Sequence, residues 1–224
     1  MRGRAPHLLT REQLAAVALP VGDDGVVIGE DDRGDPAVLG LFRPKAYRIV
    51  LIGGLWTAQL LALRAAATGA RVAVETGRGP VWTPVARAAG GPPPGITVHP
   101  VGGPGPQRAS QTAPVLAVRD CGSRPARSRL SPGPWEATLT LLPFLEPESE
   151  PLLAAADLVG VQRLSPQEAA LAGRVLRLPG AAVAALPELG DGVTLWSDGR
   201  NRVFVRSGPT PTEVQILGRA RRVD

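Results

Sequence analysis

The sequence predicts a three-layer α/β fold with a mainly parallel sheet. Short runs rich in Val, Ile and Leu alternate with helical runs through the middle of the chain. The chain has 224 residues, of which 44% are hydrophobic, enough to build a packed core. Because successive parallel strands need crossover connections, this alternation favours a buried parallel sheet with right-handed crossovers.

The first 44 residues predict a short helix followed by a β-hairpin. Thr10 can cap the helix, and the runs 26–28 and 37–42 are typical of strands on either side of an acidic turn. We expect residues 45–224 to form one compact α/β unit after this hairpin.

Five strand or helix segments alternate at the start of that unit. A strand at 48–52 ends in Gly53-Gly54, and a helix follows from 55 to 68, closed by Gly69 in the position that favours a left-handed cap. The next segments are a strand at 71–75, a helix at 80–89 and a strand at 96–99.

The second half of the unit continues the pattern with more irregular connections. We expect strands at 114–118, 137–142 and 157–162, and short helices at 148–156 and from 165 to about 176. Ser165-Pro-Gln-Glu168 has the form of a capping box with proline at the first helical position. Alternation around Asp198-Gly199 predicts a final hairpin within 192–206.

Composition and charge narrow the classes of function. Glycine and proline number 27 and 24, with no triplet period, which excludes collagen. The net charge is +5, and Lys45 is the one lysine among the basic residues, so almost all of them are arginine. A GC-rich genome explains this preference for arginine, and phosphate recognition is the alternative. Aromatic residues are only 4%, which weakens any interpretation based on stacking nucleic-acid bases. The longest uncharged apolar run, 49–63, is shorter than the about 18–20 residues that span a bilayer, so we expect a cytoplasmic protein.

The turn Gly53-Gly54 is the first candidate site. Backbone N–H groups at a helix start attract anions, so a phosphate could bind there beside Thr57. A P-loop also needs a lysine and a Ser or Thr after a longer glycine loop, and residues 53–59 lack that pattern and the Gly-x-Gly-x-x-Gly pattern. A tight strand-to-helix turn without a ligand is the competing interpretation.

Asp120, at the end of an apolar strand, is the second candidate. A carboxylate there could orient a magnesium-bound water in a nucleotide hydrolase, but no Glu follows it, and a loop aspartate that caps a turn is the alternative. One cysteine and two histidines cannot make a dense metal site, and we expect Cys121 and His99 to be structural. Two groups of arginines are expected in solvated loops, with phosphate or an acidic partner as the alternative: 119, 124, 127 and 129, and 219, 221 and 222.

The last third of the chain carries a resemblance. An apolar strand is followed by Gln162-Arg163-Leu164-Ser165-Pro-Gln-Glu-Ala169, a short helix, a Leu186-Pro187 turn and a closing hairpin, with Pro209-Thr-Pro-Thr-Glu213 after it. This stretch resembles the end of FtsK/HerA-type translocation ATPases, which include those of conjugative and type VII secretion machines, and the pattern is similar to actinobacterial proteins associated with type VII secretion. The resemblance implies a P-loop, RecA-like topology in which 48–54 takes the P-loop position and 115–120 the Walker B position.

The missing P-loop lysine and hydroxyl, together with the resemblance, lead to one main hypothesis. We expect a non-catalytic, ATPase-like adaptor of a secretion or translocation apparatus, without a cofactor. It would act by binding protein partners through Trp- and Arg-bearing edges, with self-association as a further possibility. The alternative is an enzyme that binds a nucleotide or phosphate metabolite through Gly53, Gly54, Thr57 and Asp120. Nucleic-acid binding rests only on the basic charge balance.

Overall fold

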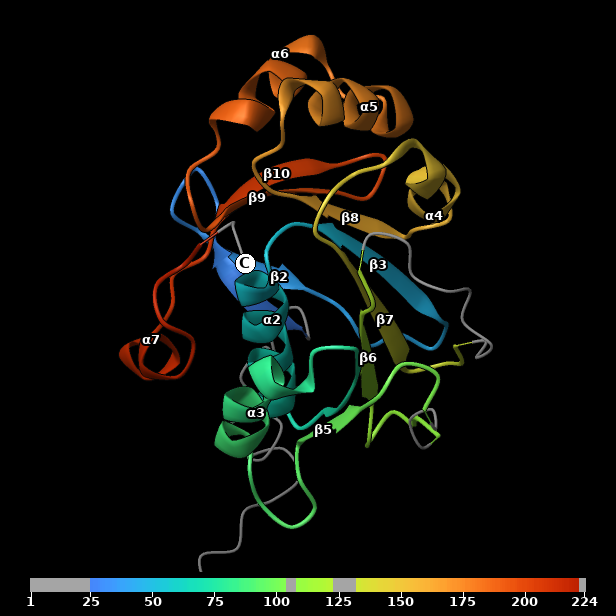
Figure 1. The fold of residues 1–224 in the computed structure, drawn as a ribbon, viewed down its shortest axis with the longest axis vertical. Coiled ribbons are helices and arrows are strands. Elements are labelled where there is room, and N and C mark those ends of the chain that lie inside the picture. Colours follow the sequence, from blue (N-terminus) through green and yellow to red (C-terminus); the bar gives the residue numbers. More distant parts are fainter. Residues whose placement is uncertain (1–24, 104–107, 123–131, 222–224) are drawn as a thin grey trace, which may run out of the picture.

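A ten-stranded sheet organises the computed structural model, which describes residues 25–103, 108–122 and 132–221 (Figure 1). The strand order is β2-β1-β10-β9-β8-β3-β7-β6-β4-β5, in which β8, β3, β7, β6, β4 and β5 are mutually parallel and the remaining pairs antiparallel. The strands are β1 Val26–Glu30, β2 Pro36–Leu39, β3 Tyr47–Ile52, β4 Arg71–Thr76, β5 Ile96–His99, β6 Val115–Asp120, β7 Glu136–Leu142, β8 Leu158–Val161, β9 Val193–Ser197 and β10 Arg202–Arg206. The prediction of a mainly parallel sheet is confirmed.

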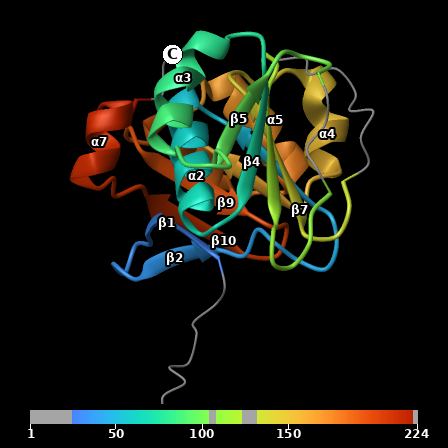
Figure 2. The same ribbon diagram turned by 90° about the horizontal axis from the view of Figure 1, so that it is seen from below.

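Helices cover both faces of this sheet, which confirms the three-layer prediction. Helices α2, α3 and α7 lie on one face, and α4, α5 and α6 on the other (Figure 2). The helices are α2 Leu55–Ala67, α3 Gly79–Ala88, α4 Glu150–Ala154, α5 Pro166–Leu176, α6 Gly180–Ala185 and α7 Pro211–Leu217, with 3₁₀ turns at Pro147–Ser149 and Leu186–Glu188.

The central strand β3 divides the apolar core into two clusters. Ile49 and Leu51 point into the cluster under α2 and α3, whereas Val50 and Ile52 point into the cluster under α4 and α5. Because successive side chains of a strand face opposite sides, an apolar run is needed on a strand that is covered on both faces. This explains the unbroken apolar run at 49–52 in β3.

The hairpin β1–β2 continues the main sheet. Strand β1 pairs with β10, and its Val26 and Ile28 are buried in the same cluster as the residues under α2. The β9–β10 hairpin forms around Asp198-Gly199 as predicted. The predicted helix near Thr10 lies outside the described residues, and the boundary between 44 and 45 stays a prediction.

Local end signals set several helices. Gly69 follows α2 with φ +89°, as its predicted capping role requires. The Ser165 capping box at the start of α5 is confirmed, with both of its reciprocal hydrogen bonds present. Helices α6 and α7 were not predicted, although Thr210-Pro-Thr-Glu213 makes a second capping box of the same form at the start of α7.

Candidate functional site

The turn between β3 and α2 is too short to enclose a phosphate. Strand β3 ends at Ile52 and α2 begins at Leu55, so only Gly53 and Gly54 connect them. The backbone of Gly54, the N-cap residue, is extended, with φ −82° and ψ 154°. A P-loop instead wraps several consecutive N–H groups around the phosphates, which needs a longer loop.

The side chain of Gln162 occupies the space in front of the α2 N-terminus. Gln162 directly follows β8, the parallel neighbour of β3, and is 3% exposed. Its Oε1 accepts a hydrogen bond of 2.7 Å from the N–H of Gly54. A Cβ on Gly53 would collide with the same side chain, so glycine at 53 makes room for Gln162.

The amide nitrogen of Gln162 completes a closed buried network. It donates to Thr57 Oγ1 at 2.7 Å and to Thr194 Oγ1 at 3.3 Å, and both threonines are buried. The structure therefore brings the predicted residues Gly53, Gly54 and Thr57 together, around an internal amide. The carboxamide uses its oxygen on the helix start and its two N–H groups on the hydroxyls, where an anion would otherwise bind.

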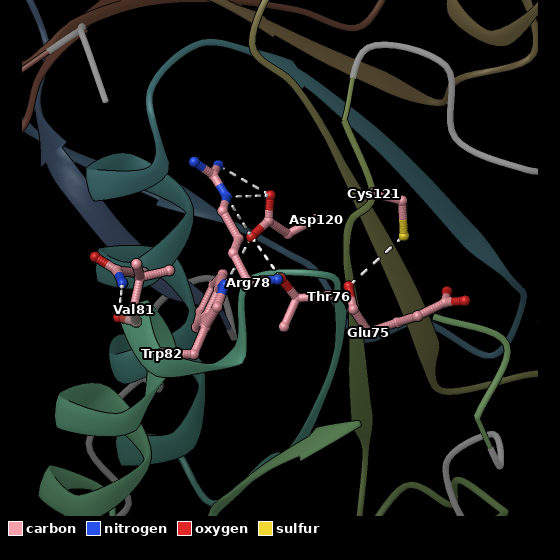
Figure 3. A network of polar contacts seen from close by, with 8 residues as sticks. Glu75, Thr76, Arg78, Val81, Trp82, Asp120 and Cys121 are labelled. Carbon is pink, nitrogen blue, oxygen red and sulfur yellow. Dashed lines mark hydrogen bonds and ion pairs between the residues drawn. The ribbon is translucent and has the colours of Figure 1, made fainter. Parts of the chain in front are cut away.

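Asp120 is engaged in a second, separate network on β6 (Figure 3). Its carboxylate accepts hydrogen bonds from Arg78 Nε and Nη2, from Trp82 Nε1 at 2.9 Å and from Thr76 Oγ1 at 2.9 Å. The side chain of Asp120 is 2% exposed, whereas that of Arg78 is 39% exposed. The alternative of a loop aspartate that caps a turn is wrong, because Asp120 is the buried last residue of a strand.

This second network leaves Asp120 poorly suited to magnesium. Ionised carboxylates offer about four lone-pair directions, and here they meet donors from Arg78, Trp82 and Thr76. Within the described residues, no three His, Cys, Asp or Glu side chains gather into a group that could hold a metal ion. Strand β7 also lies between β3 and β6, so Asp120 is about 10 Å from the β3 end on strand spacing alone.

On β4 and β6, a third pair faces away from Asp120. Arg119, expected in a solvated loop, instead lies in β6 with its side chain 10% exposed, and its Nε meets Glu75 Oε2 at 3.0 Å. Burial opposes ionisation of Glu75, but hydrogen bonds from the Gly102 N–H and from Arg119 outweigh it and lower the pKa of that carboxyl. The expectation of a solvated loop is therefore wrong for Arg119; Arg219 and Arg221 are exposed, and Arg124, Arg127, Arg129 and Arg222 lie outside the described residues.

Cys121 directly follows β6 and His99 ends β5, and among the described residues neither has a partner of the kind that nucleophilic catalysis needs. Burial raises the pKa of the Cys121 thiol to about 11, and the nearby Glu75 carboxylate adds to the rise. The thiol therefore stays protonated near neutral pH, which disfavours a nucleophilic role. Its Sγ lies 3.7 Å from the Glu75 carbonyl oxygen (Figure 3), and His99 Nε2 lies 3.1 Å from Thr97 Oγ1.

Two features of this edge of the sheet escaped the sequence analysis. Gln162 was part of the stretch that carried the resemblance, but its contact with Gly54 depends on β8 lying beside β3. Arg78 and Trp82 gave no signal either, because their meeting with Asp120 depends on β4 lying beside β6. A polar residue directly after a buried apolar strand is the signal that could have singled out Gln162.

The comparisons place this α/β architecture among known folds. No protein-family model matches the sequence, and no curated protein matches it significantly. Among solved structures, the chain is similar to VirB4 of Thermoanaerobacter pseudethanolicus, with a TM-score of 0.59 and 10% identity over 85% of this chain and 98% of that one. At this identity the likeness concerns the fold, which agrees with the RecA-like topology that the sequence resemblance implied. None of the described helices is long and apolar enough to cross a membrane.

Proposed function

We propose that this protein is a non-catalytic, ATPase-like adaptor or structural component of a secretion or translocation apparatus, and that it acts by binding other proteins. The observation that carries the non-catalytic part is the Gln162 carboxamide, which occupies the start of α2 and bonds the Gly54 N–H. Asp120 is likewise committed to Arg78 and Trp82. In this proposal the chain has an ATPase-like fold, but its own side chains occupy both the position where a nucleotide phosphate would bind, at Gly54, and the position where a metal would bind, at Asp120.

Two likenesses support the secretion part of the proposal. The order of segments after Gln162 resembles FtsK/HerA-type translocation ATPases, and the fold is similar to that of VirB4, a secretion ATPase of the P-loop class. We extend the proposal to a type VII-like machine on the strength of the sequence resemblance. In this setting the protein works in the cytoplasm, at the periphery of a membrane complex.

Three of the four tryptophans that were expected to mark partner-binding edges do not lie at the surface. Trp56, Trp82 and Trp196 are buried in the core and offer no contact surface. Phe144 is instead 62% exposed, in a loop held by the buried Leu142 and Leu145 on either side. Because aromatic residues are enriched at protein interfaces, we propose that Phe144 contributes to partner binding.

The absence of nucleotide binding is tested by thermal unfolding at matched ionic strength. We expect no shift in melting temperature for the wild type with Mg-ATP, Mg-GTP or inorganic phosphate, and no hydrolysis of ATP or GTP above background. A ligand at about 100 times its Kd would add about 2.7 kcal/mol, which is easily seen. A ligand-dependent shift in the wild type would favour the nucleotide-binding enzyme instead.

A matched pair of variants shows whether Gln162 is the cause. Gln162→Ala opens the helix start, whereas Gln167→Ala removes an exposed glutamine from α5. If phosphate raises the melting temperature of Gln162→Ala but not of Gln167→Ala, the Gln162 side chain is what excludes an anion from the start of α2.

The partner role is tested separately, by cross-linking in the native host with wild type and Phe144→Ser. Secretion components should be enriched with the wild type and depleted with the variant.

A further inference from the structure

The loop between β7 and α4 presents the most exposed large apolar side chain of the described residues (Figure 1). Phe144 is 62% exposed, whereas Leu142 and Leu145 on either side of it are buried. Both leucines belong to the apolar cluster under α4 and α5. The chain around Phe144 is therefore held against the body of the protein, although the ring itself is in contact with solvent.

Backbone hydrogen bonds and prolines restrict the course of this loop. The Leu142 carbonyl accepts from the Gly53 N–H at 3.0 Å, and the Leu145 N–H donates to Glu168 Oε1 at 2.9 Å. The same carboxylate of Glu168 takes part in the capping box at the start of α5. Proline, whose ring fixes φ, recurs at positions 143, 147 and 151. A loop restricted in this way loses little conformational entropy when a partner binds to it.

The residues around Phe144 give the loop a negative charge. Three glutamates follow Phe144, at positions 146, 148 and 150, and residues 143–151 contain no Arg or Lys. Arg174 binds Glu150 at 2.6 Å, whereas Glu168, bonded to the loop backbone, adds a fourth carboxylate. The contacts named here thus bring together four carboxylates and one guanidinium, on a chain whose net charge is +5.

We propose that residues 143–151, the Phe144 loop, bind a basic segment of a partner protein, with an arginine or lysine side chain lying against the Phe144 ring and close to the glutamates. This inference rests on the partner-binding role proposed above for Phe144, and it adds the chemistry of the partner.

A basic side chain suits both features of the Phe144 loop. A guanidinium or ammonium group is attracted to the face of an aromatic ring, and its methylene stem packs on the ring while the charged head reaches a carboxylate. An acidic segment would be repelled by the glutamates. A purely apolar segment would cover Phe144 but remove water from the neighbouring carboxylates without supplying a cation, which costs free energy.

Selection from a library identifies the chemistry of the partner directly. Short random peptides displayed on phage are selected on the full-length wild type and, separately, on Phe144→Ser, which replaces an exposed ring and should leave the fold intact. We expect the peptides enriched by the wild type alone to carry Arg or Lys beside an apolar residue. Enrichment of neutral or acidic peptides, or no difference between the two proteins, would overturn the proposal.

A matched pair of variants tests the role of charge in the Phe144 loop. Glu148→Gln removes one exposed carboxylate from the loop, and Glu188→Gln removes another exposed carboxylate, on the turn before β9. We expect Glu148→Gln to weaken binding of an enriched peptide by about three- to fivefold in isothermal titration, and Glu188→Gln to leave it unchanged. Added salt should weaken binding to the wild type, because it screens exposed charges. Equal affinities for all three proteins would show that the loop glutamates do not recognise the peptide, contrary to the proposal.

The partner-binding role of Phe144 and the basic chemistry of its partner fail in different ways. If Phe144→Ser leaves the cross-links in the native host unchanged, the partner-binding role itself is wrong. If Phe144→Ser removes those cross-links but the peptides enriched by the wild type carry no positive charge, only the basic chemistry is wrong.

Discussion

Glycine has a different role at each of the two positions before α2. At Gly53, an added Cβ would meet the carboxamide of Gln162, whose place is fixed by Gly54, Thr57 and Thr194. At Gly54, φ is −82°, a value that alanine adopts without strain. Gly54 is therefore not a position where the backbone conformation itself requires glycine. The requirement is steric, and it falls on Gly53.

The two glycines yield a direct comparison. Gly53→Ala should lower the free energy of unfolding by about 1–3 kcal/mol, because the buried amide must move from its hydrogen bonds. Gly54→Ala should cost less, about 0.5–1 kcal/mol, from the weaker N-cap preference of alanine. Urea unfolding of both variants measures the difference. A larger loss for Gly54→Ala would mean that Gln162 does not fill the turn as described.

The same capping signal begins two helices of very different burial. Ser165 starts α5, whose Ala169, Leu171 and Ala172 are buried, whereas Thr210 starts α7, in which no side chain is buried. A capping bond adds stability to its helix, but the whole protein gains it only where that helix is part of the cooperative core. The two boxes therefore separate local from global stability.

Matched alanine substitutions test this distinction. Ser165→Ala should lower the free energy of global unfolding by about 1 kcal/mol, through loss of the α5 N-cap. Thr210→Ala should leave the global value within about 0.3 kcal/mol and instead speed hydrogen exchange within α7. Calorimetry and hydrogen exchange on both variants give the two readouts. Equal global losses would show that α7 unfolds only together with the sheet.

Elements were predictable where the signal lies within a few residues. The capping box of Ser165, the left-handed cap at Gly69 and the apolar run of β3 are such signals, and the structure has all three. The box at Thr210 was equally readable and was missed. Helix α6 has no polar cap, since Pro179 precedes it and its residues are Gly, Ala and Val, which gave no clear end signal.

The contacts that define the site could not be predicted in the same way. Gln162 meets Gly54 across 108 positions of sequence, and Arg78 meets Asp120 across 42. Each contact depends on which strands become neighbours, a property of the whole sheet. The sequence therefore identified Gly53, Gly54, Thr57 and Asp120 as a group of interest but could not show that internal side chains already bind them.

At the scale of the molecule, the continuous sheet ties the first described strands to the last ones. Strand β1 pairs with β10, and Val26 and Ile28 share one apolar cluster with Ile49 and Leu51 of the central strand. Units that share a core and a hydrogen-bonded sheet unfold together, whereas units joined by a linker unfold apart. The predicted boundary at residue 44 can be tested on this basis.

We expect residues 25–206, which contain all ten strands, to unfold in one cooperative transition. Removing the hairpin would expose the edge of β10 and the apolar residues that Val26 and Ile28 cover, so the hairpin cannot remain folded while the sheet melts, or the reverse. Differential scanning calorimetry should give a single peak in which the van't Hoff and calorimetric enthalpies agree. Val26→Ala serves as the probe: a cavity in a shared core should lower the whole transition, by about 2 kcal/mol at its midpoint. Two resolved peaks, with only the smaller one shifted by Val26→Ala, would show that residues 1–44 form a separate unit.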